Sequence, residues 1–134
     1  MSRTWTLELP PGTPFLTANN RDHWSARQRT TANLYAVIKT LVVMHKVPAI
    51  ERADITVQYE PPPRLKRDRG FMASPRVEDQ DNLAPAAKAL VDGLVQAGVL
   101  PGDSRKRVRS STELLADTNP RGLLRVVITE VTNG

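Results

Sequence analysis

Three aspartates stand where they could bind a metal ion. Asp79 and Asp81 lie two positions apart just before a stretch with helical spacing, and Asp103 follows in the turn after that stretch. Hard divalent ions such as Mg²⁺ prefer oxygen ligands and usually take one or two carboxylates together with water and substrate phosphate. A sparse cluster of aspartates therefore suits a nuclease site better than a closed structural metal site.

The stretch after Asp81 predicts a helix that begins between Asp81 and Ala84 and stops at Gly98. Asp and Asn are favoured at the N-cap, and Pro85 is tolerated only in the first turn of a helix. The apolar residues at helical spacing are Leu83, Ala87, Leu90, Val91, Leu94 and Val95. A plainer alternative stays open, in which Asp81 only caps the helix and Asp79 is an ordinary loop acid.

The length of this helix constrains the site. A straight helix of about 14 residues spans roughly 20 Å, which separates Asp103 from the two aspartates at the other end. The three carboxylates can form one site only if the turn at Asp103 folds back along the helix, or if a partner subunit completes the site.

The ordered motif resembles the RusA family of Holliday-junction endonucleases. It consists of Asp79-Gln80-Asp81-Asn82-Leu83, a helix ending in Ala97-Gly98, and a short turn to Asp103. Pro10-Pro11 and Asn19-Asn20-Arg21 match the start of that family, so the resemblance runs from about residue 5 to residue 131. It implies cleavage of branched DNA by a homodimer that uses Mg²⁺ or Mn²⁺, with Asp79, Asp81 and Asp103 as catalytic metal ligands.

Two positions depart from the family pattern. Gly102 stands where the family often has a second acid, and Pro85 stands where its lysine usually follows the motif. Lys88, one turn further along the helix, lies on nearly the same face and is the candidate for the catalytic role of that lysine. Alternatively, Lys88 forms an ordinary surface ion pair with Asp92.

Composition narrows the class of protein. The chain has 134 residues, no cysteine, a formal net charge of +5 and a pI near 10.1. The length suits one domain, here 1–134, and the charge favours a polyanionic partner. Because no run approaches 18 apolar residues and the start lacks signal-peptide features, we expect no membrane segment. The expected location is the cytoplasm of a bacterial cell, whether the gene belongs to the cell or to a phage.

Basic residues gather in two stretches on either side of the expected helix. The first, at about 61–78, is rich in proline and arginine, and we expect it to form a flexible loop that holds DNA phosphates near the aspartates. The second begins just after Asp103. The residues expected to contact DNA are Arg64, Lys66, Arg67, Arg69, Arg76, Arg105 and Lys106.

The remaining patterns predict the elements that must position these residues. Alternation predicts strands at 5–9, 53–59, 107–115 and 123–131, and helical spacing predicts a long helix over 24–44. His23, just before that helix, is expected to be a surface or capping residue. The order predicts an α/β domain, β-α-β-α-β-β, with two helices packed on a mixed sheet. The last two strands are expected to pair as an antiparallel hairpin.

Two functions of other classes stay open beside a metal-dependent endonuclease. The departures at Gly102 and Lys88 leave room for a non-catalytic, structure-specific DNA-binding protein. A metal-dependent enzyme that acts on a small phosphorylated substrate would also use a sparse set of aspartates.

Overall fold

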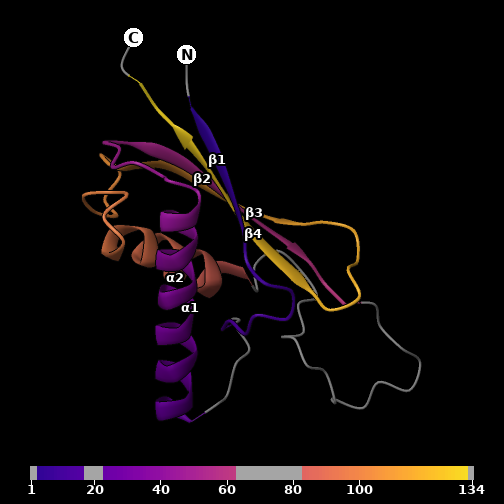
Figure 1. Ribbon diagram of the computed structural model, residues 1–134. Coiled ribbons are helices and arrows are strands. Elements are labelled where there is room, and N and C mark those ends of the chain that lie inside the picture. Colours follow the sequence, from indigo (N-terminus) through magenta and orange to yellow (C-terminus); the bar gives the residue numbers. More distant parts are fainter. Residues whose placement is uncertain (1–2, 17–22, 63–82, 133–134) are drawn as a thin grey trace, which may run out of the picture.

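The computed structural model describes residues 3–16, 23–62 and 83–132. The elements follow the predicted order, and the mixed sheet with two helices confirms the predicted α/β class (Figure 1). They are β1 (Thr4–Glu8), α1 (Trp24–Met44), β2 (Ala53–Glu60), α2 (Ala84–Gln96), β3 (Val108–Leu115) and β4 (Leu123–Glu130).

The four strands form one sheet in the order β1-β4-β2-β3. β4 runs antiparallel to both β1 and β2, whereas β2 and β3 are parallel. The predicted hairpin between the last two strands is therefore wrong, because β2 lies between β3 and β4. Burial explains the difference. β4 carries the buried Leu124, Val126 and Ile128, which need an interior place in the sheet, whereas the more polar β3 is tolerated at an edge.

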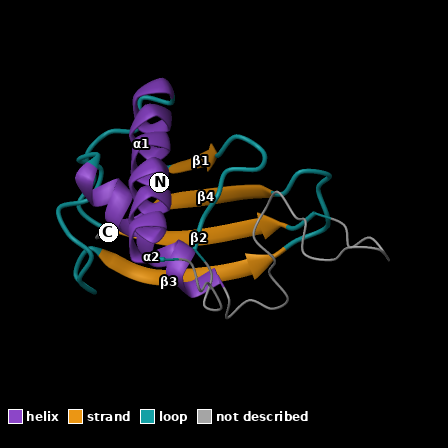
Figure 2. Cartoon of the chain, turned by 90° about the horizontal axis from the view of Figure 1, so that it is seen from below, coloured by secondary structure: helices purple, strands orange, loops and turns teal. Residues whose placement is uncertain are grey.

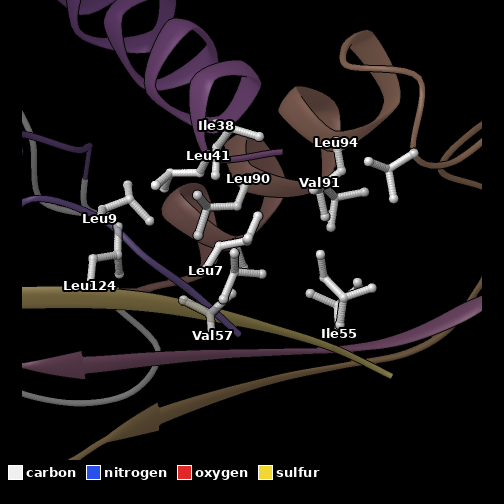
Figure 3. Packing of buried hydrophobic residues seen from close by; sticks show 14 of the residues in the cluster. Leu7, Leu9, Ile38, Leu41, Ile55, Val57, Leu90, Val91, Leu94 and Leu124 are labelled. Carbon is white, nitrogen blue, oxygen red and sulfur yellow. The ribbon is translucent and has the colours of Figure 1, made fainter. Parts of the chain in front are cut away.

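Both helices cover the same face of the sheet (Figure 2). On that face Ile55 and Val57 of β2 pack beneath Leu90 of α2 and Ile38 of α1 in one apolar core (Figure 3). These side chains are almost fully buried. Burial of that extent is the main stabilising contribution to a domain of this size, and it fixes where α2 stands over the sheet.

The two halves of α1 differ in burial. Its buried residues are Leu34, Ile38, Leu41 and Val42, all in the C-terminal half, and no residue between 24 and 33 is buried. Figure 1 shows the N-terminal half extending past α2. His23 is the N-cap residue, and its Nδ1 accepts a hydrogen bond from the backbone N–H of Ser25 at 3.2 Å. The expectation of a capping histidine is confirmed.

Neither α1 nor α2, the helices of the described residues, has the length and apolar character needed to cross a lipid bilayer.

Candidate active site

Lys88 and Asp103 come together beside α2. The Nζ atom of Lys88 lies 3.5 Å from Oδ2 of Asp103 and 3.6 Å from Oδ1 of Asp92. Lys88 is in the first half of α2, whereas Asp103 follows the end of the helix, so the turn folds back along α2 to make this contact. The ion pair with Asp92 also confirms the plainer expectation for Lys88, which therefore bridges two carboxylates.

The return of the chain toward Lys88 has a local cause. α2 ends at Gln96, and Gly98 adopts a φ of 84°, a left-handed conformation that glycine takes without steric cost. Val99 and Leu100 then bury their side chains in the core. The carbonyl of Val99 also accepts a 2.8 Å hydrogen bond from the N–H of Ile50. These anchors direct the next residues, including Asp103, back over the helix.

The charges around Lys88 are close but open to solvent. Its side chain is 71% exposed and that of Asp103 is 57% exposed. The pKa of Lys88 is raised by the negative charge of Asp92 and by the hydrogen bond and charge of Asp103. The ammonium is therefore cationic at neutral pH, and solvent screening keeps each single pairing weak. Such a group can exchange its carboxylate partners for a phosphate at little cost.

A cavity of about 250 Å³ lies between α2 and the edge strand β3. Its lining includes Lys88, Asp92 and Asp103, and also Ala84, where the helix starts. From β3 it receives Glu113, a third carboxylate in the described part of this cavity. The remaining lining residues are Ala87, Val91, Val108 and Ser111.

A β-bulge in β3 shapes this wall of the cavity. Ala53 pairs with Val108 but the next residue, Asp54, pairs with Ser110, so Arg109 is an extra residue in β3. In a regular strand, Val108 and Ser111 would face opposite sides of the sheet because side chains alternate. The bulge brings both to the side that α2 covers, and Glu113 follows Ser111 on that side.

Asp92 and Glu113 were not among the predicted site residues. Asp92 appeared only as a surface partner of Lys88, and Glu113 was hidden because its side depends on the bulge at Arg109. Helical spacing from Lys88 places Asp92 on the same face of α2. The sequence alone therefore predicts that Asp92 lies beside Lys88, whereas no local pattern in it predicts a β-bulge.

Of the three predicted metal ligands, Asp103 lies in the described part of the chain. Asp79 and Asp81 lie outside the described residues, and the N-cap of α2 falls on Leu83 rather than on Asp81. Within 3–16, 23–62 and 83–132, no group of three or more His, Asp or Glu side chains lies together in a way that could hold a metal ion. The carboxylates of Asp103 and Glu113 are nonetheless the hard oxygen donors that Mg²⁺ takes. They suit that ion chemically, provided that further ligands join them.

The second basic stretch divides into two kinds of residue. Arg107 pairs with Glu51 at 2.6 Å, and Arg109 pairs with Asp54. Arg105 and Lys106, in the turn before β3, are exposed and make no ion pair with any other described residue. Of the residues predicted to contact DNA, these two lie in the described part of the chain, and both are available to bind phosphate. The other five, Arg64, Lys66, Arg67, Arg69 and Arg76, lie outside the described residues, as does the loop at 61–78 beyond Pro62.

Tyr35 of α1 reaches the same charges from the other helix. Its pKa is raised by burial and then by the negative charge of Asp92, while the positive charge of Lys88 lowers it. A close approach of α1 to α2 makes this possible, because a Cβ atom at Gly93 would stand 3.3 Å from Cδ1 of Tyr35. A glycine at that position in α2 leaves room for the ring.

Comparison of the sequence with known protein families finds no match, and comparison with curated proteins finds none either. The resemblance to the RusA endonucleases therefore stays a prediction.

Proposed function

We propose that this protein is a divalent-metal-dependent endonuclease that cleaves branched DNA such as a Holliday junction. The observation that supports this most is the contact between Lys88 and Asp103. The two residues come from opposite ends of α2 in the sequence, yet they line one cavity with Ala84 at the helix start. Three peptide units separate Asp81 from Ala84 in the sequence. The Cα atoms of these two residues can therefore be at most about 11 Å apart.

Each described residue has a distinct part in this proposal. Asp103 contributes a carboxylate to the metal site that Asp79 and Asp81 complete. When bound, the metal ion supplies an activated water and stabilises charge on the scissile phosphate. Lys88 is cationic and exposed, so its ammonium can stabilise the negative charge that develops on the phosphate oxygens. Asp92 orients that ammonium from one turn further along α2.

The binding surface and the assembly belong to the same proposal. Arg105 and Lys106 stand close to Asp103 in sequence and hold the DNA backbone through their charges, together with the basic residues of 61–78. A four-way junction has two scissile strands related by two-fold symmetry, which favours a symmetric homodimer with two sites. Light scattering should give the mass of a dimer, and a monomer mass both free and on DNA would contradict that assembly.

One observation favours a second candidate. The carboxylate of Asp103 is already matched by the ammonium of Lys88, and a neutralised acid has less attraction for a cation. A protein that recognises branched DNA through its basic residues and does not cut it would keep such a pair. This candidate predicts junction binding with no cleavage in Mg²⁺ or Mn²⁺.

The deciding experiment compares wild type with Asp81→Asn and Asp103→Asn on a fixed four-way junction and on linear duplex, in Mg²⁺ and in chelator. Asn keeps the shape of Asp but not its charge. Each variant should therefore stay folded, bind the junction at least as well as wild type and lose cleavage by at least about 100-fold. Asp117→Asn, an exposed acid in the turn before β4, is the matched control and should cut normally.

The outcomes separate the candidates. Wild type that binds the junction but cuts it with neither ion would support the non-catalytic protein. Cleavage by Asp81→Asn or Asp103→Asn at the wild-type rate would show that the nuclease chemistry, if present, does not use these aspartates.

A further inference from the structure

The N-terminal half of α1 is cationic, and none of its residues from 24 to 33 is buried. No Asp or Glu occurs between Trp24 and Met44, whereas Arg27 and Arg29 both lie in the half without buried residues. Both arginines are exposed, and neither makes an ion pair with another residue of the described ranges. Residues two positions apart point to opposite sides of a helix, so the two arginines make both sides of this half positive, and such charge attracts phosphate.

An open cavity of about 610 Å³ lies along the same half of the helix. Trp24, Gln28, Thr31 and Tyr35 line it at helical spacing, with Arg27 beside them. Leu16 and Ala32 complete the lining. Trp24 is 67% exposed, although a ring of that size is normally buried in a core or an interface. An exposed aromatic ring beside an arginine is a surface suited to stacking a nucleic-acid base.

We propose that this cavity binds an unpaired nucleotide of DNA, with the base stacked on Trp24 and its phosphate held by Arg27. Gln28 and Thr31 offer amide and hydroxyl groups that can hydrogen-bond a base edge. The cavity volume lies in the range of ordinary small-ligand sites. The charge of α1 favours an anionic partner, and the exposed ring of Trp24 beside Arg27 favours a nucleotide over an acidic peptide, because a base can stack on it.

The position of Tyr35 relates this cavity to the candidate active site. Tyr35 lines the cavity beside α1, and its Cδ1 atom lies 3.3 Å from where a Cβ atom of Gly93 would stand, directly after Asp92 in α2. A strand whose scissile phosphate lies at Lys88 would therefore have a neighbouring nucleotide near α1. Unpaired nucleotides occur in flaps and forks, whereas a fully complementary four-way junction exposes one only where its centre is opened, so the inference specifies which feature of branched DNA is recognised. It rests on the proposed function only in taking DNA as the partner.

The test uses the full chain in chelator, so that cleavage plays no part. Trp5 and Trp24 are the only tryptophans, and a Trp5→Phe background makes Trp24 the single reporter. A ten-residue oligothymidine should quench its fluorescence. In labelled-oligonucleotide binding, Trp24→Ala should bind about 5- to 100-fold more weakly, as expected when one base no longer stacks. Trp24→Phe should keep most of the affinity, because its ring still stacks.

Two controls make the result specific. Met44→Ala removes an exposed apolar side chain from the other end of α1, where 68% of Met44 is accessible, and should bind like wild type. A paired duplex of the same length should be bound within about twofold by wild type and Trp24→Ala, because its bases stack on one another.

Either of two results would overturn the inference: wild type that does not bind oligothymidine at low salt, or Trp24→Ala that binds it as Met44→Ala does. Cleavage of a junction by wild type in Mg²⁺ would then still support the proposed function. Conversely, oligothymidine binding that depends on Trp24, without any junction cleavage, would support the inference while the nuclease assignment fails.

Discussion

The cavity between α2 and β3 and the cavity beside α1 carry opposite charges. Asp92, Asp103 and Glu113 line the first, with Lys88 as its one described cation. The second has Arg27 and the rings of Trp24 and Tyr35, and no acid among its described lining residues. In a protein with a net charge of +5, three described carboxylates thus share one cavity, and the cationic aromatic surface is separate from them. Under the function proposed above, this difference corresponds to a division between chemistry and binding.

The largest effect is expected at Lys88. Lys88→Ala should lower junction cleavage by about 100- to 1,000-fold, because the variant lacks one charge-stabilising group at the phosphate. Binding should change by less than about twofold. Lys39→Ala, which removes an exposed lysine from α1, is the matched control. The measurement is single-turnover cleavage with excess enzyme, together with a binding titration in chelator.

Two outcomes would contradict the assignment of chemistry to the α2 cavity and of binding to the cavity beside α1. If Lys88→Ala cuts normally, Lys88 serves only to pair with Asp92 and Asp103. If its binding and cleavage instead fall in equal measure, the α2 cavity contributes to affinity as well as to chemistry.

An intermediate effect is expected from the cations that follow Asp103. Replacement of Arg105 and Lys106 together by Gln should lower the slope of log affinity against log salt by about 1.8, because each phosphate that is no longer neutralised accounts for about 0.9 of that slope. Replacement of Arg107 and Arg109 removes the same charge, but these residues are engaged by Glu51 and Asp54. Their replacement should change the slope much less. Equal slopes for the two double variants would contradict the distinction between free and paired cations.

The smallest effect concerns Asp54, which pairs with Arg109, the extra residue at the bulge in β3. The guanidinium of Arg109 and the hydroxyl of Ser110 hold the pKa of Asp54 below its ordinary value. Asp54→Asn should lower the free energy of unfolding by about 1 kcal/mol near pH 7, since the arginine is about half exposed.

The pH dependence of this effect follows from the direction of the shift. The stabilisation is complete above the pKa of an unfolded aspartate and disappears as the pH falls through the lower, folded value. Urea unfolding should therefore show wild type and Asp54→Asn converging in acid, below about pH 4. A stability difference that stays constant down to about pH 2 would show that the charge of Asp54 has no part in it.

Local periodicity was sufficient to predict the elements. The helix Trp24–Met44 has the predicted bounds, and each strand agrees within about one residue at either end. The one strand pairing that was predicted, the antiparallel hairpin of the last two strands, is wrong, because alternation shows which side of a strand is apolar but not which strand lies beside it. The composition of β3 does favour an edge position in the sheet, since its Arg, Ser, Thr and Glu side chains are polar and suited to an edge strand.

The candidate site was predicted in part. Lys88 and Asp103 were named from the sequence, and the structure brings them together. Their contact depends on the buried Val99 and Leu100 and on a left-handed Gly98, which are tertiary features that no local pattern specifies. Asp79 and Asp81 lie outside the described residues, so the predicted metal site stays a prediction.

The bulge at Arg109 also determines how β3 could change in length. Ala53 opposes Val108 and Asp54 opposes Ser110, so deletion of Arg109 would leave both pairings in place as neighbours in a regular ladder. Deletion of any residue from Ser111 to Leu115 would instead exchange the two sides of the strand around it. The strand β3 can therefore lose Arg109 without a change in its pairing with β2. Val108, Ser111 and Glu113 would stay on the side of the sheet that α2 covers.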